Sequence, residues 1–119
     1  YKNIIMKIKK ITKPWGYEKI LELNNKYVLK ELFMKKGHRC SLQYHQKKME
    51  TFFVVKGHLK LYHGKSKKNL KIKRFKSGDY LTIKPKYIHR MEAVINTTYL
   101  EASTPEINDV IRLIDDYGR

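Results

Sequence analysis

The stretch GHRCSLQYHQKKMETFFVVKG, residues 37–57, decides the fold of this chain. An alternating segment, Ser41–Gln46, and an apolar run, Thr51–Lys56, flank a polar turn at residues 47–48. Short apolar runs bounded by turn residues are typical of β-strands. Gly57 ends the second run and marks another turn. The stretch therefore predicts a β-hairpin that leads directly into a further strand.

Polar side chains of this predicted hairpin gather on one face. Residues two apart in a strand point to the same side, so Gln43 and His45 share a face. The turn then allows Glu50 to lie opposite His45. Cys40 has the opposite parity to Gln43, so we expect it to pack against neighbours and not to act as a nucleophile. An amide oxygen, an imidazole and a carboxylate are thus expected to converge.

The same pattern of short apolar segments extends along the chain. Turns interrupt the segments about every 8–12 residues, which is typical of a sandwich or barrel. Residues 109–116 are compatible with a short helix or a last strand. We predict an all-β single domain over residues 13–119, with residues 1–12 as an N-terminal extension and a short C-terminal segment. The expected strands are Tyr17–Leu23, Tyr27–Lys35, Ser41–Gln46, Thr51–Lys56, Leu59–Gly64, Leu70–Phe75, Tyr80–Ile83, His89–Ile95 and Tyr99–Ala102.

The charge of the chain is strongly positive, with a formal net charge of +16. Of its 27 basic residues 22 are lysines spread along the whole chain, whereas nucleic-acid readers rely on arginine for bidentate contacts. We therefore predict no specific nucleic-acid partner and a surface that attracts small anions such as sugar phosphates. Residues 101–119 carry five acids and two bases, so this tail is expected to dock on the basic barrel.

The cellular setting is indicated by three features. Cys40 is the single cysteine, which excludes an internal disulfide and fits a reducing compartment. No apolar run approaches the ~20 residues of a membrane span. No signal-peptide pattern opens the sequence. These features predict a cytoplasmic protein that does not bind membranes.

A second group of polar residues lies further along the chain. Gly78 begins a turn that leads to Pro85 and His89, and His89 shares a face with Met91. Two imidazoles, a carboxylate and an amide oxygen suit a divalent transition metal such as Zn, Mn, Fe, Co or Ni. The spacing alone leaves open that the histidines are packed or surface residues.

These residues resemble the two motifs of the cupin superfamily, which implies a jelly-roll-like β-barrel. Fixed positions of the first motif fall on Gly37, His45, Glu50 and Gly57. Those of the second motif fall on Gly78, Pro85 and His89. The chain departs from the pattern at three places: Gln43 replaces the first histidine, Lys86 the usual glycine and Ala93 the usual asparagine.

The glutamine points to a subfamily. Segment Ser41–His45, with Glu50 following, resembles the C-terminal cupin domain of type II mannose-6-phosphate isomerases, a domain often fused to a mannose-1-phosphate guanylyltransferase. The opening segment Lys13–Glu18 and the closing segment Asp109–Arg119 resemble that family too. Thr51 stands where the family often has histidine.

The resemblance implies a metal-dependent isomerase that interconverts mannose 6-phosphate and fructose 6-phosphate through an enediol. The implied metal ligands are Gln43, His45, Glu50 and His89. Lys30, Arg39 and Arg112 are candidates to hold the phosphate. We expect Arg112 to support catalysis as well, and Glu101 is the candidate general base.

Other interpretations stay open at this point. One is an epimerase or ketoisomerase that acts on a nucleotide sugar in polysaccharide synthesis, and another is a non-catalytic cupin that binds sugar or metal. Arg39 and Arg112 have an alternative role as salt-bridge partners of the acidic tail, and Trp15 is expected to plug the core. The resemblance also implies a homodimer.

Overall fold

Eleven β-strands and no helix form residues 9–119, the part of the chain that the computed structural model describes. The prediction of an all-β domain is confirmed. No helix in this part is long and apolar enough to cross a membrane. The strands are β1 (Lys9–Lys13), β2 (Gly16–Leu23), β3 (Val28–Met34), β4 (Leu42–Tyr44), β5 (Glu50–Lys56), β6 (His58–Gly64), β7 (Lys71–Lys76), β8 (Tyr80–Ile83), β9 (Ile88–Ala93), β10 (Thr97–Ser103) and β11 (Ile111–Ile114).

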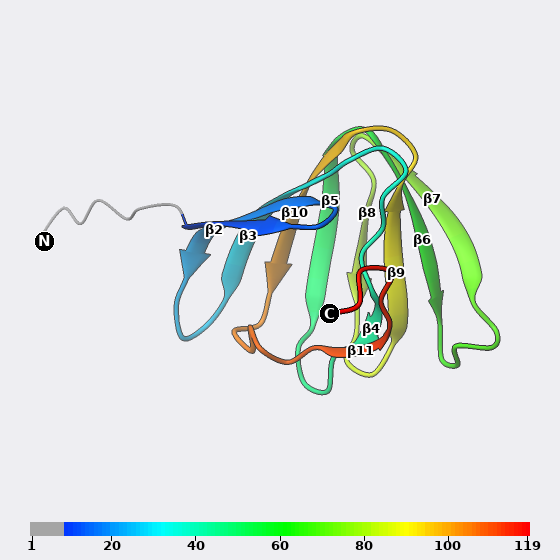
Figure 1. Cartoon of the computed structure of the whole chain (residues 1–119). Coiled ribbons are helices and arrows are strands. Elements are labelled where there is room, and N and C mark those ends of the chain that lie inside the picture. Colours follow the sequence, from blue (N-terminus) through cyan, green and yellow to red (C-terminus); the bar gives the residue numbers. More distant parts are fainter. Residues whose placement is uncertain (1–8) are drawn as a thin grey trace, which may run out of the picture.

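The strands build two antiparallel sheets that face each other as the walls of an open barrel (Figure 1). One sheet has the strand order β1-β2-β3-β10-β5-β8, and the other has the order β11-β4-β9-β6-β7. The segment after β10 runs across from the first sheet to the second, where β11 pairs with β4 (Figure 1). This crossing brings the C-terminal segment over the space between the sheets.

The core fills the space between the two sheets because each strand alternates its side chains. In β3, for example, every second residue is buried. The Phe52 and Phe75 rings, one from each sheet, meet edge to face with centroids 4.9 Å apart. Met91 and Tyr99 are also buried in this cluster. Trp15 is 4 % exposed and belongs to the same cluster, in line with its expected role as a core residue.

Two sequence predictions about the strands need correction. The predicted hairpin of Ser41–Gln46 with Thr51–Lys56 is wrong, because β4 and β5 lie in different sheets. The connection between them, residues 45–49, is a bridge between the sheets. The sequence pattern could not separate these cases, since both arrangements reverse the chain over the same few residues.

The two ends of the chain compare differently with the expectation. Residues 9–12 belong to β1, which pairs with β2, so the predicted boundary between residues 12 and 13 falls inside a strand. Residues 1–8 of the predicted extension lie outside the described residues. Within the tail at 109–116, residues Ile111–Ile114 form the strand β11, which is the second of the two alternatives that the sequence left open.

Gly57 occupies a place that no other residue fits. Its φ angle is 127°, and a Cβ there would lie 2.3 Å from the Thr97 Oγ1 and 2.7 Å from the Thr97 Cα. Gly78 offers a matched control, because its φ of 91° is also positive but nothing lies within 4 Å of a Cβ built there. The close approach of the Gly57 backbone to Thr97 therefore explains why the turn after β5 needs glycine.

We expect Gly57→Ala to destabilise the fold more than Gly78→Ala does. Both variants carry the backbone cost of about 1–2 kcal/mol for a positive φ. Gly57→Ala adds a steric cost of about 1–3 kcal/mol, because backbone atoms of Thr97 must move. Chemical denaturation of the two variants measures the difference, and equal free energies of unfolding would contradict the steric argument.

Candidate functional site

Three buried side chains converge between the sheets. His45 follows β4, Glu50 begins β5 and His89 lies on β9. The Glu50 Oε1 lies 2.9 Å from the His45 Nε2 and 3.3 Å from the His89 Nε2. One donor atom from each side chain lies within 4.8 Å of the others, the arrangement of a metal centre.

A backbone carbonyl fixes the orientation of each imidazole on the side that faces away from Glu50. The Nδ1 of His45 lies at hydrogen-bond distance from the Asp109 carbonyl, and the Nδ1 of His89 lies 2.9 Å from the Tyr87 carbonyl. A carbonyl only accepts, so each Nδ1 carries its proton, and the Nε2 of each ring faces Glu50, where it can donate to the carboxylate when protonated or offer a lone pair to a cation when not. Such backing bonds are the usual support of metal-binding histidines.

The donor set therefore fits a divalent cation. The two Nε2 atoms and a carboxylate oxygen face one another, and a cation between them can bind all three. Burial by itself raises the pKa of Glu50, but hydrogen bonds from the histidines and the charge of Lys48 hold that pKa well below its usual range. The carboxyl group is thus ionised, which is the state that a metal ligand needs.

Gln43 lies beside this group. It is paired with His89 in the β4–β9 register and lines the same cavity. The Ser41 hydroxyl donates a hydrogen bond of 2.6 Å to the Gln43 Oε1. An amide oxygen has two lone pairs, so the second remains available and Gln43 can serve as a fourth metal ligand.

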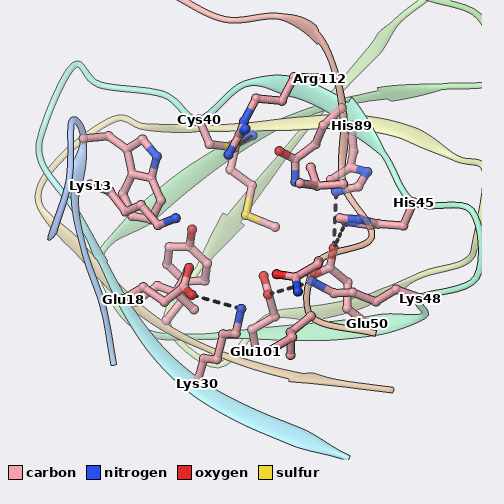
Figure 2. A pocket seen from close by; sticks show the side chains of 18 of the residues that line it. Lys13, Glu18, Lys30, Cys40, His45, Lys48, Glu50, His89, Glu101 and Arg112 are labelled. Atoms are coloured by element: carbon pink, nitrogen blue, oxygen red, sulfur yellow. Dashed lines mark hydrogen bonds and ion pairs between the residues drawn. The ribbon is translucent and has the colours of Figure 1, made fainter. Parts of the chain in front are cut away.

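The converging groups open onto a cavity of about 350 Å³ between the sheets. Figure 2 shows Lys13 and His45 on opposite sides of it. The wall contains core residues such as Tyr99 and Met91 and residues of the C-terminal segment such as Val110. The charged and metal-facing groups of the wall are Lys13, Glu18, Lys30, Gln43, His45, Lys48, Glu50, His89, Glu101, Arg112 and Arg119.

Buried charges of alternating sign line one side of this cavity (Figure 2). The Lys30 Nζ lies 3.0 Å from the Glu18 Oε1. The Lys48 Nζ lies 3.9 Å from a carboxylate oxygen of Glu50 and 3.9 Å from one of Glu101. Burial and the neighbouring Glu50 charge raise the pKa of Glu101 well above its usual range. The pKa of Glu50 is thus lowered and that of Glu101 raised, although the Lys48 ammonium group lies near both carboxylates.

Cationic side chains gather on the side of the cavity that carries Lys13. Burial lowers the pKa of Lys13, and the nearby charges of Arg119 and Arg112 lower it further against the opposing charge of Glu18. Among the described residues, Arg112 takes part in no salt bridge, while Arg119 is held by Asp115. Positive charge therefore exceeds negative charge here, which favours an anionic ligand.

Trp15 adds a hydrogen-bond donor to the cavity wall. Its indole Nε1 is buried and has no hydrogen-bond partner in the described part of the chain. A buried donor without a partner costs about 1–3 kcal/mol, so a ligand oxygen that accepted from it would recover that cost. Trp15 is thus both a core residue and a candidate ligand contact.

Two expectations from the sequence differ from the observed positions. The Arg39 guanidinium donates to both carboxylate oxygens of Asp116, at 2.6 and 3.1 Å, and Arg39 is not among the residues that line the cavity. Its alternative role as a salt-bridge partner of the acidic tail is therefore the one observed. Cys40 lines the cavity although strand parity placed it opposite Gln43, because residue 40 precedes the regular part of β4. Burial raises the pKa of the Cys40 thiol to about 11, so it is not a nucleophile at neutral pH.

Sequence reasoning missed several wall residues. Lys13, Lys48 and Arg119 line the cavity, but none was a candidate site residue. Lys48 carried no signal from strand parity, because it lies in the connection between β4 and β5 and not in a strand. Lys13 and Arg119 carried none either, since their positions depend on how the two ends of the chain fold back.

The fold is that of the cupins. The described barrel superposes on a double-stranded β-helix protein from Klebsiella pneumoniae with a TM-score of 0.74 and 15% identity, covering 93% of this chain and 97% of that one. KdgF from Halomonas sp. gives a TM-score of 0.72 at 14% identity, covering 84% of this chain and 90% of that one.

Larger proteins contain the same barrel as one part. Oxalate decarboxylase from Bacillus subtilis matches with a TM-score of 0.78 and 16% identity, covering 89% of this chain. This chain spans 30% of the length of that protein. At these identities the likeness is one of fold.

The sequence itself gives the family. Residues 2–113 match the family described as mannose-6-phosphate isomerase C-terminal, which covers most of the 119 residues. The chain belongs to this family. No curated protein sequence matches it.

Proposed function

We propose that this cupin domain is an aldose–ketose isomerase that interconverts mannose 6-phosphate and fructose 6-phosphate. The observation that carries the proposal is a single cavity with the His45, Glu50 and His89 donors on one side and surplus positive charge near Lys13 on the other. A sugar phosphate has sugar oxygens that suit the side with the His45, Glu50 and His89 donors, and a phosphate dianion that suits the positive charge near Lys13. Membership of the isomerase family supports the same substrate class.

The reaction moves one proton between two adjacent carbon atoms and a second proton between the oxygens that those carbons carry, so that hydroxyl and carbonyl exchange places. A carboxylate beside the substrate takes the proton from one carbon and returns it to the next, and the Glu101 side chain faces the cavity for this role. A raised pKa makes its carboxylate a stronger base once ionised. Lys48 lies between Glu101 and Glu50 and keeps negative charge balanced as the proton moves.

A divalent cation would be held by His45, Glu50 and His89, with Gln43 as the fourth ligand. When bound, it supplies positive charge that stabilises the oxygen anion of an enediol-like transition state. Lys13, Arg112 and Arg119 bind the phosphate and so fix the sugar chain relative to Glu101.

A turnover assay tests the proposal. Protein reconstituted with cobalt, zinc or manganese is incubated with mannose 6-phosphate, and fructose 6-phosphate is measured; the same protein stripped with chelator is the control. Turnover limited to nucleotide sugars would replace the proposal by an epimerase or ketoisomerase. Metal binding without turnover on any sugar phosphate would overturn it in favour of a binding protein.

Arg112→Lys is expected to lower kcat/KM by about 10-fold or more while leaving the melting temperature unchanged. A guanidinium holds a phosphate through two parallel hydrogen bonds, which an ammonium group cannot reproduce. Arg112 is exposed at the edge of the cavity, so the exchange costs little stability. The measurement is a thermal melt beside the isomerase assay. Arg39→Lys is the matched control, because that arginine is engaged by Asp116. Equal loss in both variants would contradict the assignment.

A further inference from the structure

Asp109, in the segment before β11, makes an unusual set of contacts. Its carboxylate accepts hydrogen bonds from three successive backbone N–H groups: Gln46 at 3.0 Å, Lys47 at 2.7 Å and Lys48 at 2.9 Å. These three residues make up most of the connection between β4 and β5. The carboxylate therefore caps the bridge between the two sheets from a position more than 60 residues away in the chain.

The main chain of the same residue contacts the site directly. The His45 Nδ1 donates to the Asp109 carbonyl. The capped connection carries His45 at one end and Glu50 at the other, with the buried Lys48 between them. One residue thus holds the backbone that spaces two metal-facing side chains and also supports the ring of one of them.

The other aspartates of the tail have different duties. Asp116 pairs with Arg39 and Arg90, and Asp115 pairs with Arg119. Neither contacts the connection between β4 and β5 through a hydrogen bond among the described residues. Asp116 offers a control from the same acidic segment. Its replacement removes the ion pairs with Arg39 and Arg90 but leaves the contact between Asp109 and His45 in place.

We infer that Asp109 is a positioning residue that sets the geometry of the His45 and Glu50 ligands, so that the C-terminal segment governs metal affinity. The inference rests on the metal centre of the proposed function but not on its sugar substrate. The carboxylate prevents the connection from moving, and this keeps the Asp109 carbonyl within reach of His45. Supporting bonds of this kind change metal affinity by about 10–100-fold when removed.

Cobalt binding to the whole chain tests this inference. Asp109→Ala, Asp109→Asn and Asp116→Ala are titrated with cobalt(II) alone, followed by its visible absorption, at a temperature where melts show every variant folded. We expect Asp109→Ala to bind about 10–100-fold more weakly than the parent, and Asp116→Ala to bind like the parent. Asp109→Asn keeps one acceptor oxygen, so its affinity should fall between the two.

The outcomes are separable from those of the proposed function. Parent-like affinity in Asp109→Ala would overturn the inference, as would an equal loss in Asp116→Ala or a parent that binds no cobalt. If Asp109→Ala does not fold, Asp109→Asn decides, and parent-like affinity there overturns the inference. A parent that binds cobalt but turns over no sugar phosphate would refute only the isomerase function.

Discussion

Replacing His45 or His89 by alanine is expected to remove the metal from the protein. The parent should carry about one divalent transition metal per chain, as one site of this kind holds one ion. Each histidine supplies one of three converging donor atoms, and its loss leaves the buried Glu50 with a single imidazole partner. Loss of a direct ligand should cost more than loss of a supporting bond, so we expect affinity to fall by well over ~100-fold. Isomerase activity should fall with metal content.

Elemental analysis of purified protein checks this expectation, with His63→Ala as the matched control. His63 lies opposite His89 in the β6–β9 register, but its ring bonds the Tyr87 hydroxyl and is absent from the converging group. Melts in the presence of chelator show whether a variant has lost its fold as well as its ligand. Equal metal content in parent, His45→Ala and His89→Ala would remove the metal assignment.

Local patterns predicted much of the site because they are set by strand geometry. The two-residue period puts Gln43 and His45 on one face, and both line the cavity. Turn residues marked most strand ends, so β6 and β8 came within a residue of their predicted bounds. The donor residues themselves stood out by chemical type.

What could not be predicted depends on contacts between distant segments. The pairing of β4 with β9 and β11, and not with β5, is decided by the whole barrel. Arg39 and Arg112 look alike in sequence, yet one meets Asp116 and the other borders the cavity. Asp109 gave no signal as a cap because the backbone that it holds lies at residues 46–48. Side-chain parity is local, whereas the partner of a charged group is not.

Glu101 is the residue whose neutral replacement should separate catalysis from stability. Its carboxyl group is buried on β10, lines the cavity and lies near Lys48. Its pKa is raised well above the usual value, chiefly by burial and then by Glu50. A raised pKa means that the folded state binds the proton more tightly than the unfolded state does. This group therefore contributes stability at pH below the unfolded pKa, and that contribution is lost as the pH rises toward the folded pKa.

Glu101→Gln should consequently lower kcat by about 10²–10⁴-fold, the usual contribution of a general base, while the melting temperature at pH 7 stays the same or rises. The amide keeps the shape of the side chain and cannot ionise, so the decline in stability with rising pH should also become flatter. Glu92→Gln is the control, because Glu92 accepts from the Tyr62 hydroxyl and is not among the cavity residues. Assays with mannose 6-phosphate and melts across pH measure both effects. Turnover near the parent level in Glu101→Gln would exclude Glu101 as the base, whereas lost turnover with a lowered melting temperature would assign it a structural role. Lost turnover in a variant as stable as the parent supports a proton-transfer role, because a glutamine of the same shape preserves the packing of β10 and removes the acid–base chemistry together with the ion pair to Lys48.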